Sequence, residues 1–448
     1  MKYLINVLFS IIIFLFAING CNNDNTPTSP NNSVNWQDTL KVSLITNDLE
    51  DDLYVGQRVY YSYSIMPGDF SDSIIVDWKT SDTSIARRIN EYGGFELVDL
   101  GKVSIKINVY DNKQNFITSD SVIIRCKWKK TCSVSGSISS ITYDRQSNMI
   151  LAGTHYGNGI LMSETAGDSW NFANNGINLN GQTIIYDLDY CRSNPENIIA
   201  LVGDNNGRYL YYSTNHGNFW AHNNINNMTF SVAMHPFHDH LLFSLSILSD
   251  LYVNKSDNLG ATWVLLSTLN NPSGQIPKLF INQNNPEKMF IGGHGSFFSS
   301  DSGRTWSLIQ WQHQGPDFQI LFLDNAGNIY VRDYNWDGTI RMRIVKSGDD
   351  GATWSIVKVM EKGNFISTFT VYDRDINLLS FSTHDGGDII ISKDGGLTWS
   401  PIKTYFISTL YYANIILILN SNPLELIVTS ASDIPYGGDG IWKYTEIN

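Results

Sequence analysis

A short motif with a serine, a glycine and a tryptophan occurs six times in this chain and constrains its fold more than any other feature. The copies cover residues 163–170, 213–220, 256–263, 299–306, 347–354 and 392–399. Successive tryptophans lie 50, 43, 43, 48 and 45 residues apart. A fixed period of this length indicates a repeat architecture, and about 40–50 residues suit one four-stranded blade of a β-propeller.

The segments between the motifs predict the strands of the blades. Each unit has three apolar runs before the motif, and the tryptophan begins a fourth. Six such units span residues 138–403, and a seventh begins at residue 412 but lacks a fourth strand. Trp128 lies 42 residues before Trp170, which is one repeat, so residues 125–130 are expected to supply the missing strand. This closure would remove the exposed edges of the ring.

The motif has the composition of a tight turn. Aspartate accepts hydrogen bonds from backbone N–H groups, glycine adopts a positive φ, and tryptophan covers the turn from the core. The aspartate position holds Thr165, Asn215 and Asn258 in the first three copies, which suits a structural turn and not a catalytic carboxylate. The motif resembles the Asp-box, or BNR repeat, of sialidases, xyloglucan-cleaving glycosidases, sortilin-type receptors and a propeller assembly factor of photosystem II. Because it joins third to fourth strands, we expect it on the face opposite to the ligand-binding loops.

The segment at residues 36–125 lacks the motif and has short runs of alternating apolar and polar residues. Gly and Asp cluster between the runs, which is typical of a β-sandwich. Residues 78–86, Trp-x-x-Ser-Asp-x-x-Ile-Ala, followed by residues 101–105, resemble the bacterial immunoglobulin-like group 2 domain, and the resemblance implies a spacer. The chain is therefore predicted to be all-β: an N-terminal immunoglobulin-like sandwich at 36–125, followed by a seven-bladed Asp-box β-propeller at 126–448.

The N-terminus predicts export and lipidation. Lys2 precedes an apolar run at residues 4–18, which is short for a membrane span and lies where a signal peptide lies. Cys21 follows, as in the lipobox of bacterial lipoproteins, where cleavage leaves the cysteine as the lipid-bearing N-terminus. We expect a signal peptide at 1–20, a polar tether at 21–35, and an outer-membrane lipoprotein of the bacterial envelope, periplasmic or surface-facing, whose only membrane contact is this lipid. An ordinary secretory signal with a chance cysteine is the alternative.

Charge and cysteine content limit the partners and cofactors. The net charge of −13 argues against nucleic-acid binding, which needs a basic surface. Cys126, Cys132 and Cys191 leave at least one thiol unpaired, and their spacing is not that of a zinc site. The histidines of residues 235–240 are interpreted as a variant turn. We expect a monomer with neither cofactor nor metal.

Candidate ligand-binding residues occupy the loops between second and third strands and the connections between blades. Propellers usually bind ligands on this face. These loops are rich in Asn, Asp, His and aromatic residues, although loops are often polar whatever their role. Rings can stack on sugars while amides and carboxylates bind hydroxyl groups, so we expect a glycan or a protein ligand at the cell surface. The candidates are His155, Tyr156, Asn205, Arg208, His294, Trp311, His313, Tyr334, Trp336, His384 and Tyr436.

Catalysis has weaker support in the sequence. The N-terminal Arg-Ile-Pro motif of sialidases is missing. A glycosidase needs two carboxyl groups about 5–10 Å apart, and the sequence does not show which of its aspartates meet. The weak candidates are Asp204, Asp333, Asp337 and Asp385. Non-catalytic binding is therefore the favoured function; a glycoside hydrolase or lyase acting on polysaccharide, and an assembly or scaffolding factor that binds a protein, are the alternatives.

Overall fold

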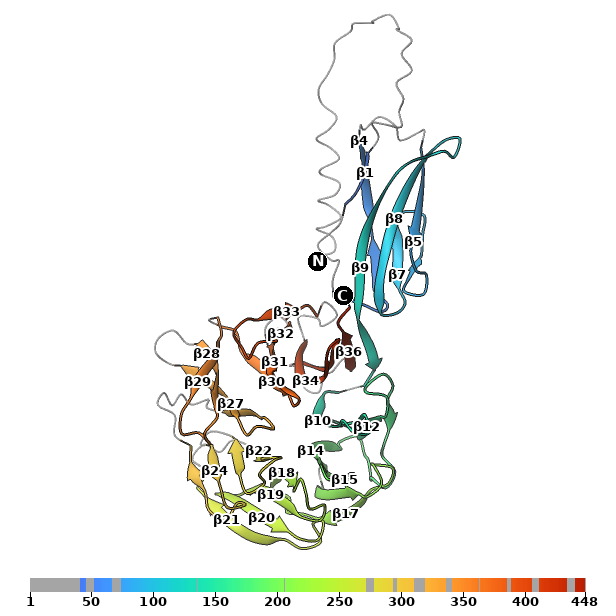
Figure 1. Cartoon of the computed structure of the whole chain (residues 1–448). Coiled ribbons are helices and arrows are strands. Elements are labelled where there is room, and N and C mark those ends of the chain that lie inside the picture. Colours follow the sequence, from blue (N-terminus) through green and yellow to red (C-terminus); the bar gives the residue numbers. More distant parts are fainter. Residues whose placement is uncertain are drawn as a thin grey trace, which may run out of the picture.

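A computed structural model of the chain shows a ring of β-sheets with a smaller β-rich part attached at one side (Figure 1). The structure describes residues 41–45, 52–66, 74–134, 136–204, 206–270, 278–292, 296–309, 319–335, 341–361, 363–384, 388–404, 411–432 and 440–447. Every regular element in these ranges is a strand, so the predicted all-β class is confirmed. Over the same ranges the chain has no helix of the length and apolarity that a membrane span requires.

Six consecutive four-stranded antiparallel sheets form most of the ring. Within each sheet the strands pair in chain order, and the first strand lies towards the centre of the ring (Figure 1). The tryptophan period therefore counts propeller blades. Blade 1 consists of β10 (Ile138–Asp144), β11 (Met149–Thr154), β12 (Ile160–Ser163) and β13 (Asn171–Phe172), and blade 2 of β14 (Ile184–Cys191), β15 (Asn194–Asp204), β16 (Gly207–Ser213) and β17 (Ala221–Asn224). Blade 3 consists of β18 (Thr229–Met234), β19 (Leu242–Ile247), β20 (Leu251–Ser256) and β21 (Val264–Leu269), and blade 4 of β22 (Lys278–Ile281), β23 (Met289–Gly292), β24 (Phe297–Ser299) and β25 (Ser307–Leu308). Blade 5 consists of β26 (Gln319–Leu323), β27 (Ile329–Asn335), β28 (Arg341–Ser347) and β29 (Ser355–Val359), and blade 6 of β30 (Ile366–Tyr372), β31 (Asp375–Thr383), β32 (Ile389–Ser392) and β33 (Ser400–Ile402).

The seventh blade takes its fourth strand from the N-terminal side of the ring. Its strands are β34 (Tyr411–Ser421), β35 (Leu424–Ser432), β36 (Ile441–Thr445) and β9 (Phe116–Cys132), paired in that order. Tyr444 of β36 lies opposite Trp128 of β9, and the ladder continues to Cys132. The predicted closure of a seven-bladed propeller is confirmed, with the paired residues at 128–132 and not at 125–130.

The six repeated motifs, termed tryptophan turns below, join the third and fourth strands of blades 1 to 6. In every copy the hydroxyl of the first serine accepts a hydrogen bond from the glycine N–H at 2.8 or 2.9 Å. In the regular copies the aspartate also accepts from the threonine, as Asp394 does from the N–H and hydroxyl of Thr398 at 2.9 and 2.6 Å. In the first two copies the residue at this position still accepts from the backbone four residues on: Thr165 from the N–H of Ser169 and Asn215 from the N–H of Phe219, each at 3.0 Å. The variable position is thus an acceptor for a backbone N–H in each copy.

The part attached to the ring packs three sheets around one apolar core. That core contains Trp78 and Ile107 from one sheet, Phe95 from a second and Val42 from a third. A Cβ at Gly101 would lie 2.4 Å from Cδ1 of Ile85, which explains why this motif needs glycine. The resemblance to the immunoglobulin-like group 2 domain stays a prediction. The strands are β1 (Lys41–Ile45), β2 (Leu53–Tyr54), β3 (Arg58–Tyr60), β4 (Ser62–Met66), β5 (Ile74–Thr80), β6 (Ala86–Arg88), β7 (Gly94–Leu97) and β8 (Gly101–Asp111). β5, β8 and β9 form one sheet, to which β2 is added by pairing with β9; β3, β7 and β6 form a second, and β1 and β4 a third.

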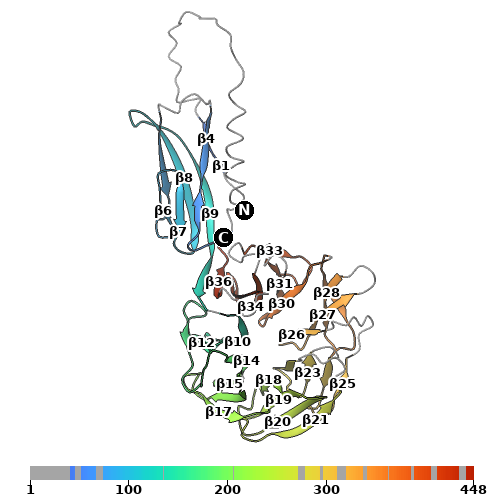
Figure 2. The same ribbon diagram turned by 180° about the vertical axis from the view of Figure 1, so that it is seen from behind.

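Strand β9 belongs to both parts of the molecule (Figure 2). From Phe116 to Cys126 it pairs with β8, and from Trp128 to Cys132 it pairs with β36. The expected boundary between residues 125 and 126 therefore falls inside one continuous strand. A strand hydrogen-bonded on both sides of a junction restricts the relative motion of the two parts.

Candidate functional site

The loop face is the end of the strands at which the second-to-third-strand hairpins and the connections between blades lie. Its described portion includes the hairpins of blades 1 and 3 and, apart from Asn205, that of blade 2. Among the sequence candidates, several lie outside the described residues, or have side chains that do. These are Asn205, His294, Trp311, His313, Tyr334, Trp336, Asp337, Asp385 and Tyr436, together with the lipidation candidate Cys21. The described candidates are His155, Tyr156, Asp204, Arg208, Asp333 and His384.

A pocket of 180 Å³ opens on the loop face of blade 2 and is termed the blade-2 pocket. It lies between the connection from β13 to β14 and the hairpin from β15 to β16, with β16 and β17 behind it. The lining residues are Asn178, Thr183, Val202, Gly203, Asp204, Asn206, Tyr209, Tyr211 and His222. Aromatic rings thus meet amide, hydroxyl and carboxylate groups in one small concavity.

Asp204 is held in a fixed orientation at this pocket. Its Oδ1 accepts a hydrogen bond from the N–H of Asn206 at 2.7 Å. Its Oδ2 accepts from the amide groups of Asn180 and Asn206 at 2.5 and 3.2 Å. The Asn206 N–H, with help from these amides, outweighs partial desolvation and lowers the pKa of Asp204. The carboxylate is therefore an acceptor at neutral pH and a poor proton donor.

Three rings form the wall of the blade-2 pocket. Tyr209 and Tyr211 lie two residues apart on β16, so their side chains share one face of the sheet. The ring of His222, on β17, has its centroid 5.4 Å from that of Tyr209 and 5.1 Å from that of Tyr211. The Tyr211 hydroxyl accepts a hydrogen bond from the N–H of Asn178 at 3.4 Å. The wall and the loop above it are thus tied together.

The candidates His155 and Tyr156 lie on the neighbouring hairpin of blade 1. The N–H of Gly157 donates to the carbonyl of Thr183 at 3.1 Å, and Thr183 lines the blade-2 pocket. The His155 ring lies edge-on to Tyr156 at 5.8 Å, and burial lowers the pKa of His155. The structure therefore brings this hairpin to the rim around Asp204, with a histidine that is neutral at pH 7.

Arg208 and His384 lie apart from the blade-2 pocket lining. The guanidinium of Arg208 stacks on Tyr186 at 4.2 Å and on Phe230 at 4.0 Å, and it donates to the carbonyl of Thr229. Both stacking faces of Arg208 are thus occupied by rings of blades 2 and 3. His384 follows β31 in blade 6, on the far side of the ring.

The described carboxylate candidates do not meet. Asp333 is completely buried in β27 of blade 5, where its Oδ2 accepts from Nε of Arg343 at 3.0 Å and also from the second guanidinium nitrogen. Asp204 lies on blade 2. Asp204 is also the single carboxylate among the described residues that line the blade-2 pocket. The described residues therefore bring no pair of these aspartates to one pocket.

The sequence reasoning missed Tyr209, Tyr211 and His222 because they lie on strands and not on loops. A signal was nevertheless present two residues after each tryptophan. His222 occupies this position in the second unit, whereas the other five units that have a tryptophan turn carry an apolar residue there. Those residues are Phe172, Leu265, Leu308, Ile356 and Pro401. A polar residue at an otherwise apolar repeat position marks blade 2 as different from its neighbours.

A second pocket, of 380 Å³, is lined by turns between first and second strands in five blades. Arg145 donates to Asp373 at 2.6 Å and to the carbonyls of Leu419 and Ile418 at 2.7 and 2.5 Å. These bonds connect blades 1, 6 and 7. Asp189 in the same pocket has its pKa raised to about 7, because it is removed from water and lies near another carboxylate. Arg145 thus has a structural role in holding the ring together.

Metal binding finds no support in the part of the chain that the structure describes. No group of three or more His, Cys, Asp or Glu residues there is placed to hold an ion. Nδ1 of His235 accepts hydrogen bonds from the N–H groups of Phe237 and His238 at 3.1 Å each, as expected for a turn. The cysteines at 126, 132 and 191 have free thiols.

No protein-family model matches this chain, and no curated protein matches it. Solved β-propellers do. The GH74 enzyme of Niastella koreensis aligns with a TM-score of 0.54 and 18% identity, covering 71% of this chain and 53% of that chain. The GH74 xyloglucanase of Xanthomonas campestris aligns with a TM-score of 0.54 and 15% identity over the same shares. The chain thus spans about half the length of these two enzymes.

YCF48 of Cyanidioschyzon merolae also has this fold. It aligns with a TM-score of 0.51 and 13% identity, covering 72% of this chain and 99% of that chain. A YCF48 structure with a bound D1 peptide aligns with a TM-score of 0.50 and 11% identity, covering 72% and 95%. At such identities the likeness establishes the β-propeller fold and leaves the activity open.

Proposed function

We propose that this chain binds a glycan, without catalysis, through the loop face of its propeller. The observation that carries the proposal is the blade-2 pocket, where the oriented carboxylate of Asp204 faces a wall made by Tyr209, Tyr211 and His222. Aromatic rings pack on the C–H faces of sugars, while carboxylate and amide groups bind their hydroxyls. The net charge of −13 favours a neutral ligand over an acidic one.

Polysaccharide hydrolysis is the second candidate. The GH74 structures share the fold, but glycoside hydrolysis requires two carboxyl groups about 5–10 Å apart, one of them with a raised pKa. Asp204 is the one carboxylate among the described lining residues of the blade-2 pocket, and its pKa is lowered. These two observations support binding in preference to cleavage at this pocket.

A protein ligand is the third candidate. A YCF48 propeller has been solved with a bound peptide, which makes a propeller of this kind suitable for an assembly or scaffolding role. The blade-2 pocket, at 180 Å³, is small for a folded partner and would accept a short segment at most.

The decisive experiment is affinity electrophoresis of the full chain in gels that contain xyloglucan, glucomannan or xylan, combined with a reducing-end assay on the same polysaccharides. Tyr209→Ala should weaken retention about tenfold or more, because it removes a ring from the pocket wall. Tyr212→Ala is the matched control, since Tyr212 points to the other face of β16. Equal retention of both variants would refute binding at this pocket, and release of reducing ends would favour the hydrolase.

We also propose that the chain is a lipoprotein of the bacterial envelope, anchored through Cys21. The support is the apolar run at residues 4–18 followed by this cysteine and a polar tether. Cys21→Ser should move the protein from the membrane fraction to the soluble fraction. If the variant stays with the membranes, the lipid anchor is excluded.

A further inference from the structure

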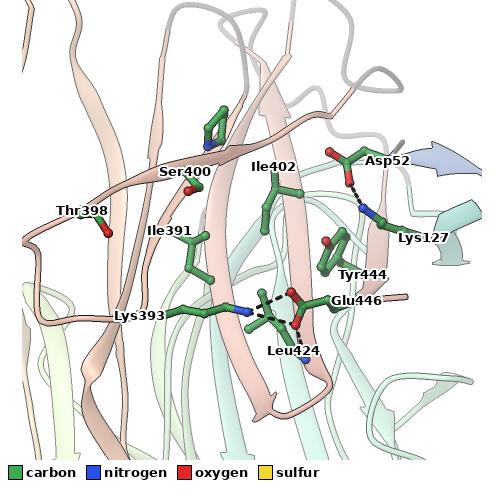
Figure 3. A pocket seen from close by; sticks show the side chains of 11 residues that line it. Asp52, Lys127, Ile391, Lys393, Thr398, Ser400, Ile402, Leu424, Tyr444 and Glu446 are labelled. Atoms are coloured by element: carbon green, nitrogen blue, oxygen red, sulfur yellow. Dashed lines mark hydrogen bonds and ion pairs between the residues drawn. The ribbon is translucent and has the colours of Figure 1, made fainter. Parts of the chain in front are cut away.

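A pocket of 490 Å³ lies where the N-terminal part meets the propeller (Figure 3). Asp52 comes from the N-terminal part, Lys127 from β9, Lys393 from blade 6 and Glu446 from the end of blade 7. This junction pocket shares no residue with the blade-2 pocket. Lys393 and Thr398 belong to the sixth tryptophan turn, so the junction pocket opens at the end of the strands opposite the loop face.

The floor of the junction pocket is apolar. Ile391 and Ile402 of blade 6 are each 5% exposed, and Leu424 and Tyr444 of blade 7 are 1% and 4% exposed. These side chains fill the space between two blades and present C–H groups and one ring edge to the pocket. Because these side chains are almost completely buried, they close the floor and leave little apolar area for a ligand, so binding here depends mainly on the polar groups of the lining.

The polar groups of the junction pocket are paired charges. Nζ of Lys393 lies 2.9 and 3.1 Å from the two carboxylate oxygens of Glu446, and Nζ of Lys127 lies 3.0 Å from Oδ1 of Asp52 (Figure 3). Each ammonium in the lining therefore has a carboxylate partner. An ionic ligand would have to break one of these pairs, which is costly for Lys127 and Asp52, whose side chains are 13% and 12% exposed, and less so for the half-exposed Lys393.

A ligand that binds through neutral hydroxyl groups leaves both ion pairs unbroken and avoids this cost. An ammonium has three N–H donors and a carboxylate has about four lone-pair sites, so the Lys393–Glu446 pair retains both donors and acceptors for a ligand. The exposed hydroxyl of Ser400 adds a further donor and acceptor at the edge of blade 6. The chemistry of the lining thus matches a neutral molecule that has many hydroxyl groups.

The walls of the junction pocket are fixed in advance. Oδ2 of Asp52 accepts a hydrogen bond from the N–H of Lys403 at 3.1 Å, which ties the N-terminal part to blade 6. The indole N–H of Trp128 donates to the carbonyl of Lys403 at 3.0 Å, which ties β9 to the same residue. Because these bonds set the distance between the walls, a ligand would not have to order them.

We propose that the junction pocket is a carbohydrate site that takes a short neutral oligosaccharide. The proposal goes beyond binding at the loop face, because the two pockets differ in every residue and open at opposite ends of the strands. With both sites occupied, one molecule holds two separate sugar chains, and its avidity for a polysaccharide network exceeds that of either site.

The test is calorimetric titration of the full chain with xyloglucan heptasaccharide, cellohexaose and mannohexaose. The double variant Lys393→Met/Glu446→Gln removes the ion pair without leaving one charge alone. The matched control is Arg87→Met/Glu96→Gln, an exposed pair on the N-terminal part. At least one of the three probes should bind the wild type with a Kd that rises about tenfold or more in the pocket variant and stays unchanged in the control.

A second variant leaves the ion pairs intact. Ser400→Phe places a ring in the mouth of the junction pocket, and because Ser400 is exposed, the thermal midpoint should not change. The same loss of binding is expected as for the double variant. The proposal is overturned if none of the three probes binds the wild type, or if all variants bind alike. A loss confined to Tyr209→Ala would also overturn it while supporting the loop-face site. Binding that survives Tyr209→Ala but is lost in Ser400→Phe would support the junction pocket and count against the loop-face site.

Discussion

The indole N–H of Trp170 donates a hydrogen bond to the hydroxyl of Thr131 at 3.1 Å, across the closure of the ring. Trp306 makes the equivalent bond to Ser267 at 3.0 Å between two ordinary neighbouring blades. In both pairs 39 residues separate the partners, and the tryptophan of one blade reaches the fourth strand of the blade before it. Strand β9 therefore resembles a regular fourth strand in two respects: it pairs with the third strand of its blade, and it accepts a hydrogen bond from the tryptophan of the next blade.

This equivalence predicts equal effects of two substitutions. Thr131→Val and Ser267→Ala each remove the acceptor for a tryptophan N–H, which retains a bond to its own glycine carbonyl. Each should lower the free energy of unfolding by about 0.5–1.5 kcal/mol. Urea unfolding followed by tryptophan fluorescence measures both. A loss for Ser267→Ala with none for Thr131→Val would show that the closing strand contributes less than a regular one.

The tryptophan turns should make stability depend on acidic pH. The hydroxyl and N–H of Thr305 lower the pKa of Asp301 to about 2, below the value of about 3.9 in an unfolded chain. A carboxylate with a lowered folded-state pKa stabilises the fold above about pH 4 and loses that contribution as the pH falls towards 2. Asp301→Asn should therefore be less stable than the wild type at neutral pH, by a difference that shrinks as the pH falls from about 4 towards 2. A difference that stays constant over this range would contradict the assignment.

The contact between the N-terminal part and the propeller depends on Asp52. Its carboxylate is nearly buried and accepts bonds from Lys127 and from the N–H of Lys403. Asp52→Ala should cost about 1.5–3 kcal/mol and separate the unfolding of the two parts in calorimetry. Asp99→Ala removes the exposed partner of Lys129 and should cost less than about 1 kcal/mol. Equal effects would mean that strand β9 alone holds the two parts together.

The ring itself could be predicted because one local motif fixes the register of every blade. Each tryptophan turn needs its own glycine and tryptophan, so the spacing of those residues measures the blades directly. The same spacing identified Trp128, which is completely buried in blade 7. A prediction that depends on local chemistry repeated along the chain does not require knowledge of long-range contacts.

The pockets could not be predicted in the same way. The junction pocket is formed by Asp52, Lys393 and Glu446, which belong to no shared motif; Asp52 lies more than 300 residues before Lys393, and Glu446 lies 53 residues after it. The expectation that the tryptophan turns lie opposite to the ligand-binding loops gave no reason to look for a pocket beside them, and the sixth turn lines one with Asp52 only in the folded chain. In the blade-2 pocket Asp204 was predictable from its loop, whereas Tyr209 resembles any strand tyrosine.

The repeat offers one further test of the blade-2 pocket. His222 stands where blade 3 has Leu265 and blade 4 has Leu308, and its ring lies against Tyr209. His222→Leu restores the residue type usual at this position, so the free energy of unfolding should change by no more than about 0.5 kcal/mol. Retention on polysaccharide gels should nevertheless weaken about tenfold, because the pocket loses its imidazole. The reciprocal variant Leu265→His serves as the control and should leave retention unchanged. If His222→Leu binds as the wild type does, His222 has no role in ligand binding and the loop-face ligand contacts other residues.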